Sequence, residues 1–274
     1  MTALEVAAQG IGLLGPGLPS WLAGRRILRG EEPYDSTPTM LAPPTRLPPT
    51  ERRRAGTSIR LAMAVADEAV AQARVDPQHV ATVFASSGGE GANCHALCET
   101  LAGASRRVSP TRFTNSVHNA TAGFWHIAVS SRATSTSLSA YDGSFAAGLI
   151  EAATQVLCAR APVLFVACDV PYPEPLHSLR TLPHPFGLAL LLTPLDAAGP
   201  GVRLAIDLID AAAADPPSLC VDAELDALRR RVPAAAALPL LEAIANGDQQ
   251  HQLVLDYLPA LKLRVAVNAA TQPS

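Results

Sequence analysis

The stretch STSLSAYDGSFAAGLIEA, residues 135–152, decides the fold. It begins as a short strand, passes through a tight turn and continues from Ser144 as a helix of small and apolar residues. A strand–turn–helix elbow projects its turn residue outward, and many enzymes hold a nucleophile there. The turn carries Tyr141 here, and a phenol with a pKa of ~10 is a poor acyl acceptor. The sequence therefore predicts a catalytic geometry without its usual nucleophile.

Strands and helices alternate on both sides of the elbow. Apolar residues from Thr57 onward recur at helical spacing, and the run at 80–91 is typical of a buried strand that enters a Ser/Gly loop. Further strands are predicted at 162–168, 186–193 and 202–208. This alternation predicts an α/β fold with a mixed sheet covered on both faces.

The two ends of the chain are expected to complete the sheet. The apolar run that reaches Gly10 suits a sheet edge that leads into a glycine-bearing loop. The proline-rich segment 33–50 can be neither a central strand nor a helix, so we expect an extended surface connection. In the final third, helices are predicted at 224–232 and 238–248, and a last strand at 261–269.

The composition excludes several classes of protein. A chain of 274 residues that is 49% hydrophobic can bury a sizeable core. Its net charge of -3 provides no basic field, so nucleic acid is not an expected partner. The longest apolar runs are too short for a membrane span, which needs roughly 20 residues. Five cysteines, an odd number without a secretory n-region, indicate reduced thiols and a cytoplasmic location.

Two short motifs could bind a ligand. NCHALC contains Cys94, His95 and Cys98, but a metal site needs a second ligand pair, and no other Cys/His pair has matching spacing. The SSGGE loop at 86–90 could hold an anion on its backbone N–H groups, yet it lacks the lysine of a Walker loop. We therefore expect no metal and no cofactor, and a structural turn at 86–90.

Two histidines flank a helix that is expected to begin near Asn119. His118 and His126 could each act as a general base beside a nucleophile, although a lone histidine is more often structural. Phe124 and Trp125 lie between them, and such a pair is more often core or interface than a ligand shelf.

The order of these motifs resembles the N-terminal half of the β-ketoacyl synthases of the thiolase superfamily. The resemblance is strongest to the short ketosynthase-like proteins of aryl-polyene (xanthomonadin-type) clusters, and it covers about residues 3–195. It rests on GIGLLGPGLPSW, VFASSGGE, SPTRFTNSVHNATAGFWHIA, STSLSAYDGSFAAGLIEA, VLFVACDVPYPEPL and PFGLALLLTP. The combination of NSVHNATAG with SFAAGLIEA is fairly specific to that subgroup.

The resemblance implies a thiolase-like layered αβαβα fold, acyl carrier protein substrates and a dimer. It aligns Tyr141 with the active cysteine of the family. The family's second half supplies two histidines, whereas the corresponding part of this chain contains only His251. We expect a single thiolase-like domain over 1–274, with a ketosynthase N-terminal-like half at 1–195 and a truncated second half at 196–274.

The leading hypothesis is a non-catalytic subunit of the chain-length-factor type. It would form a heterodimer with a catalytic ketosynthase, in the elongation of aryl-polyene, fatty-acyl or polyketide chains on an acyl carrier protein. In such heterodimers the inactive subunit supplies interface and tunnel wall. The candidates for that role are Phe113, Phe124 and Trp125.

Two other functions stay open. An acyltransferase or esterase could use Ser144 or Ser139 as nucleophile with His118 or His126 as base, although DGSFAAG does not match Gly-x-Ser-x-Gly. A homodimeric protein that binds acyl chains or a carrier protein would need no catalytic residues at all.

Overall fold

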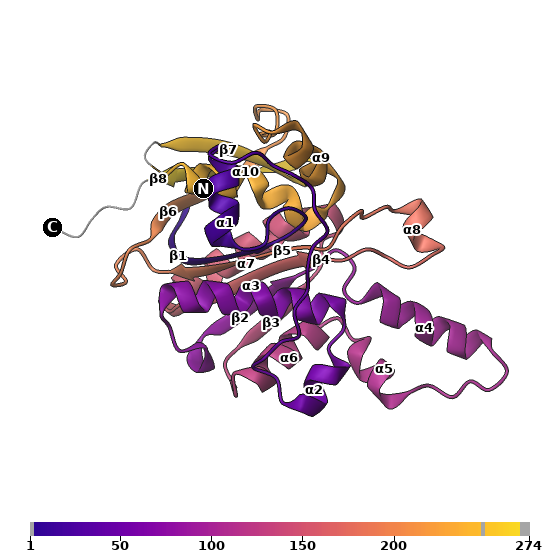
Figure 1. Ribbon diagram of the computed structural model, residues 1–274. Coiled ribbons are helices and arrows are strands. Elements are labelled where there is room, and N and C mark those ends of the chain that lie inside the picture. The colour runs from indigo at the N-terminus through magenta and orange to yellow at the C-terminus, as the bar shows by residue number, and fades with distance from the viewer. Residues whose placement is uncertain (1–2, 248–249, 269–274) are drawn as a thin grey trace.

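The computed structural model describes residues 3–247 and 250–268. Within them, eight strands form one mixed sheet in the order β3-β2-β4-β5-β1-β6-β8-β7 (Figure 1). The strands are β1 (Leu4–Leu14), β2 (Ala81–Ala85), β3 (Ser135–Leu138), β4 (Val163–Asp169), β5 (Phe186–Thr193), β6 (Val202–Asp210), β7 (His251–Leu258) and β8 (Leu261–Asn268).

Helices connect these strands and cover the sheet. They are α1 (Trp21–Leu28), α2 (Pro49–Arg54), α3 (Thr57–Ala73), α4 (Gly91–Ala102), α5 (Pro110–Asn115), α6 (Ala120–Ala128), α7 (Ser144–Ala159), α8 (Leu176–Leu179), α9 (Ala223–Arg231) and α10 (Leu238–Ala245). Short 3-10 turns are η1 (Pro77–His79), η2 (Tyr141–Gly143) and η3 (Pro233–Ala237). Among the residues described, no helix combines the length and the apolar character needed to cross a membrane.

The centre of the sheet is buried on both faces. Every residue of β4 and β5 is buried. β2 pairs in parallel with β3 and β4, and β5 runs antiparallel to β4. Strands covered on both faces need continuous apolar runs such as FGLALLL, because successive side chains face opposite cores. The strands predicted at 162–168 and 186–193 are thus confirmed, and with them the α/β class.

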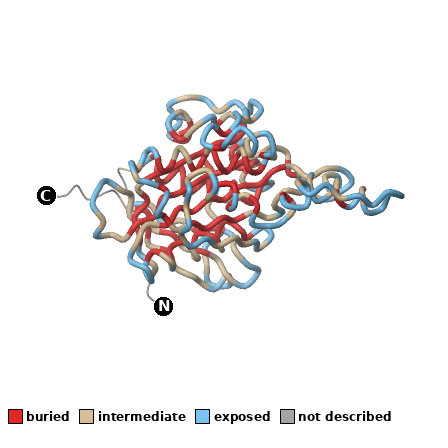
Figure 2. The backbone as a smooth tube through the Cα atoms, turned by 90° about the horizontal axis from the view of Figure 1, so that it is seen from below, coloured by how far each residue is buried: buried red, intermediate tan, exposed pale blue. Residues whose placement is uncertain are grey.

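Two apolar cores lie on the two faces of the sheet. Phe84 and Leu164 belong to the core that α3 and α6 cover. Val83 and Phe165 are the neighbours of these two residues in β2 and β4, and their side chains face the other side of the sheet. They belong to the core that α1, α7, η3 and α10 cover. Buried residues accordingly follow the sheet and the inner faces of these helices (Figure 2).

The prediction that the first strand lies at an edge of the sheet was wrong. β1 pairs antiparallel with β5 on one side and with β6 on the other. Gly10 and Gly12 lie inside the strand, where α3 packs so closely that a Cβ on Gly12 would lie 1.9 Å from the carbonyl oxygen of Val65. The glycines therefore permit a close helix–sheet contact rather than a loop.

Residues after 195 extend the same sheet. β6, β8 and β7 continue it beyond β1 in antiparallel pairs. The helices predicted at 224–232 and 238–248 are α9 and α10, and the strand predicted at 261–269 is β8; residues 248 and 269 lie outside the described residues. β7 was not predicted, because its polar first residues hide the alternating pattern that follows.

Two segments project from the body on one side (Figure 1). One carries α4 and α5, and the other carries α8 between β4 and β5. Both expose large apolar side chains, namely Leu101, Phe113, Leu176 and Leu179. These projecting segments are therefore the parts of the described chain where a contact with another protein is sought first.

Candidate functional site

The elbow has the predicted strand–turn–helix geometry. β3 leads into the turn η2, and α7 follows directly. Tyr141 has a φ of 53°, in the left-handed region that non-glycine residues rarely adopt, and the residue is 63% exposed. Gly143 is required, because a Cβ there would lie 2.6 Å from the carbonyl oxygen of Tyr257 on β7. The last hairpin therefore packs directly against the turn.

Arg180 covers one face of the Tyr141 ring. Its guanidinium carbon lies 3.6 Å from the ring centroid, and its Nη2 donates to Oδ1 of Asp142 at 2.7 Å. The Arg180 side chain is only 17% exposed. A cation over an aromatic face stabilises the pair by ~1 kcal/mol. The turn position therefore holds a phenol that packs beneath a guanidinium fixed by Asp142.

A buried carboxylate fixes the Ser/Gly loop beside the elbow. Asp169, the last residue of β4, is 2% exposed, and its Oδ1 accepts hydrogen bonds from the Ser87 N–H at 2.8 Å and the Ser87 hydroxyl at 2.7 Å. Its Oδ2 accepts from the Ala234 N–H at 2.8 Å. The Ser139 hydroxyl in turn donates to the Ser87 carbonyl oxygen at 3.3 Å. Burial raises the pKa of Asp169, while these donors oppose the rise.

Ser144, the alternative nucleophile, caps the turn. It is buried, its hydroxyl donates to the Tyr141 carbonyl oxygen at 2.7 Å, and its oxygen accepts from the Ala140 N–H at 3.0 Å. Within the described part of the chain, no histidine is hydrogen-bonded to it. The geometry gives Ser144 a structural role in holding the turn.

The histidines lie on other elements. His118 is exposed next to Gly89, where a Cβ on the glycine would lie 3.7 Å from Nδ1. Nε2 of His126 lies 3.1 Å from Oγ1 of Thr82, at the opposite end of β2 from the Ser/Gly loop, and burial lowers the pKa of His126. His251 begins β7. The structure thus pairs none of them with an elbow hydroxyl among the residues described.

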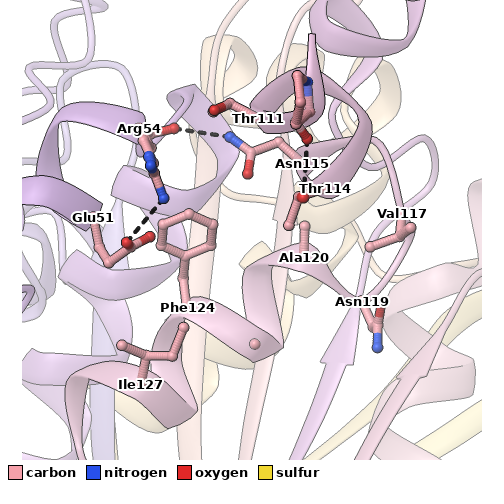
Figure 3. A pocket seen from close by; sticks show the side chains of 12 residues that line it. Glu51, Arg54, Thr111, Thr114, Asn115, Val117, Asn119, Ala120, Phe124 and Ile127 are labelled. Carbon is pink, nitrogen blue, oxygen red and sulfur yellow. Dashed lines mark hydrogen bonds and ion pairs between the residues drawn. The ribbon is translucent and has the colours of Figure 1, made fainter. Parts of the chain in front are cut away.

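The three aromatic candidates lie in different environments. Phe113 is 64% exposed on α5, whereas Trp125 is fully buried in the core beneath α6. Phe124 is buried and lines a cavity of about 320 Å³ between α2, α5 and α6. Figure 3 shows its ring beside the ion pair of Arg54 with Glu51, whose Nη1 and Oε1 atoms are 3.1 Å apart. Phe113 and Phe124 are therefore the two that reach a surface open to a ligand or partner.

The two short motifs that could bind a ligand lie in different environments, one exposed on a helix and one hydrogen-bonded within the protein. Both cysteines of NCHALC are exposed on α4, and no group of three metal-ligating side chains occurs in residues 3–247 and 250–268. In the SSGGE loop, Oγ of Ser86 accepts from the Gly89 N–H at 2.9 Å. The Glu90 carboxylate accepts from the Ser58 N–H at 3.2 Å, at the start of α3. These contacts are those of a structural turn and a helix cap.

The sequence matches a family model over most of its length. The model describes the N-terminal domain of β-ketoacyl synthases, and the match covers residues 28–256. The chain belongs to the β-ketoacyl synthase family. No curated protein sequence matches it. The elbow, the Ser/Gly loop and the Asp169 carboxylate are thus parts of a β-ketoacyl synthase domain.

Solved β-ketoacyl synthases share the fold over the whole chain. One chain of the ketosynthase ApeO in complex with its chain length factor ApeC, from Xenorhabdus doucetiae, is 25% identical, with a TM-score of 0.70 over 97% of this chain and 99% of that chain. The ishigamide ketosynthase/chain length factor is 13% identical, with a TM-score of 0.71 over 97% and 99%. A β-ketoacyl synthase from Burkholderia phymatum is 11% identical, with a TM-score of 0.69 over 99% and 100%. The expected thiolase-like ketosynthase fold is confirmed.

Proposed function

We propose that this chain is a non-catalytic β-ketoacyl synthase-like subunit of the chain-length-factor type. It pairs with a catalytic ketosynthase and serves the elongation of aryl-polyene, fatty-acyl or polyketide chains on an acyl carrier protein. The observation that carries the proposal is the elbow, where Tyr141 stands beneath Arg180 at the position of a nucleophile. The 25% identity to a chain of the ApeO–ApeC complex supports it.

An open sheet edge and an exposed aromatic side chain support the pairing. β3 is a four-residue edge strand that pairs with β2 on one side, and no described strand pairs with its other side. An unpaired edge is a template for a strand of another chain. We assign β3 and the exposed Phe113 to the subunit interface, Phe124 to the tunnel wall, and Trp125 to the core that supports them.

Coexpression with a catalytic ketosynthase, sought among the neighbouring genes, tests the assignment. We expect a 1:1 complex by light scattering. Intact mass spectrometry after incubation with acyl-loaded carrier protein is expected to show the acyl group on the ketosynthase and none on this chain. A covalent acyl adduct on this chain, purified alone, would contradict the proposal.

Tyr141→Cys is expected to restore little or no condensation in the chain alone. A thiol at the turn removes the stacking with Arg180, yet no histidine is hydrogen-bonded to the elbow in the described residues to assist decarboxylation of a malonyl unit. Condensation of acyl and malonyl carrier proteins, followed by mass spectrometry, measures the result. Tyr141→Ser serves as the control for loss of the tyrosine ring. Substantial condensation by the Tyr141→Cys variant without a partner subunit would show that this chain supplies acid–base groups of its own.

A homodimeric binding protein is the second candidate. The free edge of β3 could also pair with the same edge of a second copy, as closed two-fold dimers do. A light-scattering mass of twice the chain, unchanged when the ketosynthase is added, would favour this function. Hydrolysis of a p-nitrophenyl ester that disappears in Ser144→Ala would instead favour an esterase.

We further propose that the chain acts as a single unit in a reducing, cytoplasmic compartment. One apolar core contains residues from Val6 to Val267, so described residues on both sides of position 195 contribute to it. All five cysteines are unpaired, and three of them are exposed. Exposed thiols persist where the environment is reducing.

A further inference from the structure

A cavity of about 650 Å³ opens between the early and late parts of the chain. Residues 27–34, at the end of α1 and beyond it, form one wall, and α10 with residues 221–225 forms the other. Leu28 and Leu225 are buried and give the cavity an apolar floor. Clefts of this size and character accommodate small ligands or a single long side chain.

Glu242 brings a buried carboxyl group to this cavity. The residue is 8% exposed, and both of its carboxylate oxygens lie 3.3 Å from one donor, the Val221 N–H. It forms no ion pair within the described residues. A carboxylate offers about four acceptor sites, so a single shared and long hydrogen bond leaves it under-satisfied.

The charges beside Glu242 on α9 do not compensate it. Asp222, the cap of α9, and Asp226 both face it with negative charge. Asp226 is already paired with Arg229 and Arg230, each at 2.6 Å. Burial, reinforced by the two aspartates, raises the pKa of Glu242 to about 7, while the Val221 N–H opposes the rise.

The opposite wall adds charges that are already paired, and one aromatic ring. Arg29 lies 3.5 Å from Glu31, and its Nε donates to the Ala245 carbonyl oxygen. Glu32 pairs with an arginine of α1 at 3.0 Å. Tyr34 lines the cavity, and its hydroxyl donates to a backbone carbonyl at 3.0 Å, which holds the ring in place. Tyr34 and Glu242 line the same cavity, and an aromatic face together with a carboxylate favours a cation with an apolar stem.

We propose that this cavity binds a primary ammonium group on an apolar stem. Glu242 is the counter-ion, the Tyr34 ring lies beside the cation, and Leu28 and Leu225 contact the stem. The same chemistry is offered by a free alkylamine and by a lysine side chain of another protein. An alcohol of the same length would lack the charge that the buried carboxyl group requires.

Binding is expected to strengthen as pH rises through about 7, because the Glu242 carboxyl is neutral below that pH and charged above it. An alkylammonium stays protonated up to a pH of ~10, so the cation is present throughout this range. The bound cation favours the ionised carboxylate, so binding near pH 7 is expected to release protons. Calorimetry in two buffers of different ionisation enthalpy measures that release on the unaltered protein.

Titration of the full chain with 1-aminopentane at pH 8 tests the site directly. We expect saturable binding, no binding of 1-pentanol at equal concentration, and shifted NMR signals for Val221 and Leu225. Glu242→Gln keeps an acceptor for the Val221 N–H and is expected to weaken binding about 10- to 100-fold. Glu99→Gln removes the same charge from the exposed surface of α4, outside the cavity, and is expected to change binding less than about twofold.

The sources of the ammonium group are separated by a second probe. Binding of Nα-acetyl-lysine methylamide as tight as that of 1-aminopentane identifies a lysine side chain, and binding of the free amine alone identifies a small amine. Equal binding of amine and alcohol overturns the proposal, and so does binding that Glu242→Gln leaves unchanged. If that variant does not fold, binding of the unaltered protein without proton release is equally decisive against the site.

Discussion

Gly12→Ala is expected to remove at least about 3 kcal/mol from the free energy of unfolding. The added methyl group would lie 1.9 Å from the carbonyl oxygen of Val65, a backbone atom of α3 that cannot rotate away. Relief therefore requires α3 to move off β1, which opens the core on that face of the sheet. Urea denaturation followed by circular dichroism measures the loss, and little soluble protein at 37 °C would be consistent with it.

Gly123→Ala is the matched control for this substitution. Gly123 lies within α6, and a Cβ there would meet no atom within 4 Å. Alanine is the better helix former, so this variant is expected to gain up to about 1 kcal/mol. Equal stability of Gly12→Ala and the unaltered protein would mean that α3 does not pack on β1 as closely as described.

Asp169→Asn is expected to cost about 2–4 kcal/mol of stability. The carboxylate accepts hydrogen bonds at both oxygens, from Ser87 on one side and the Ala234 N–H on the other. An amide has one acceptor oxygen, so its NH2 group would face a donor in a buried site. Denaturant unfolding measures the loss, and faster hydrogen exchange of the Ser/Gly loop would show where it arises.

Asp196→Asn is the control for that substitution. Asp196 is exposed and pairs with Arg160 on the surface at 2.7 Å, so we expect a change below about 0.5 kcal/mol. If Asp169→Asn were as mild as this control, the carboxyl group could not be what joins β4, the Ser/Gly loop and η3.

The fold was predictable where local pattern and tertiary environment agree. β5 is apolar up to its last residue, Thr193, and has prolines on both sides, so its limits follow from the sequence alone. The edge position predicted for β1 was wrong because glycines in a local pattern indicate a loop. Gly12 is instead required by the close approach of α3, which is a long-range contact. β7 was not predicted because its first residues, His251 and Gln252, are polar and hide the apolar pattern that follows.

The candidate site was predictable only in part. Tyr141 was found because it lies between a strand and a helix whose patterns are both strong. Asp169 is the last residue of the buried strand β4, whose carboxyl end lies at the same end of the sheet as that of β3, and that position could have revealed it. Arg180 belongs to a projecting connection, and nothing in the local pattern indicates that its side chain returns to stack on the Tyr141 ring.

The close approach of Gly143 to Tyr257 has a consequence for any attempt to give this elbow a catalytic function. The backbone of β7 closes one side of the turn, because a methyl group at position 143 would lie 2.6 Å from the carbonyl oxygen of Tyr257. An acyl group and its acid–base partners need room in front of such a turn. A thiol at position 141 would leave β7 in place on that side of the turn. Groups that assist such a thiol would therefore have to reach it from the open side of the turn, where Tyr141 is 63% exposed, and not from the side that β7 occupies.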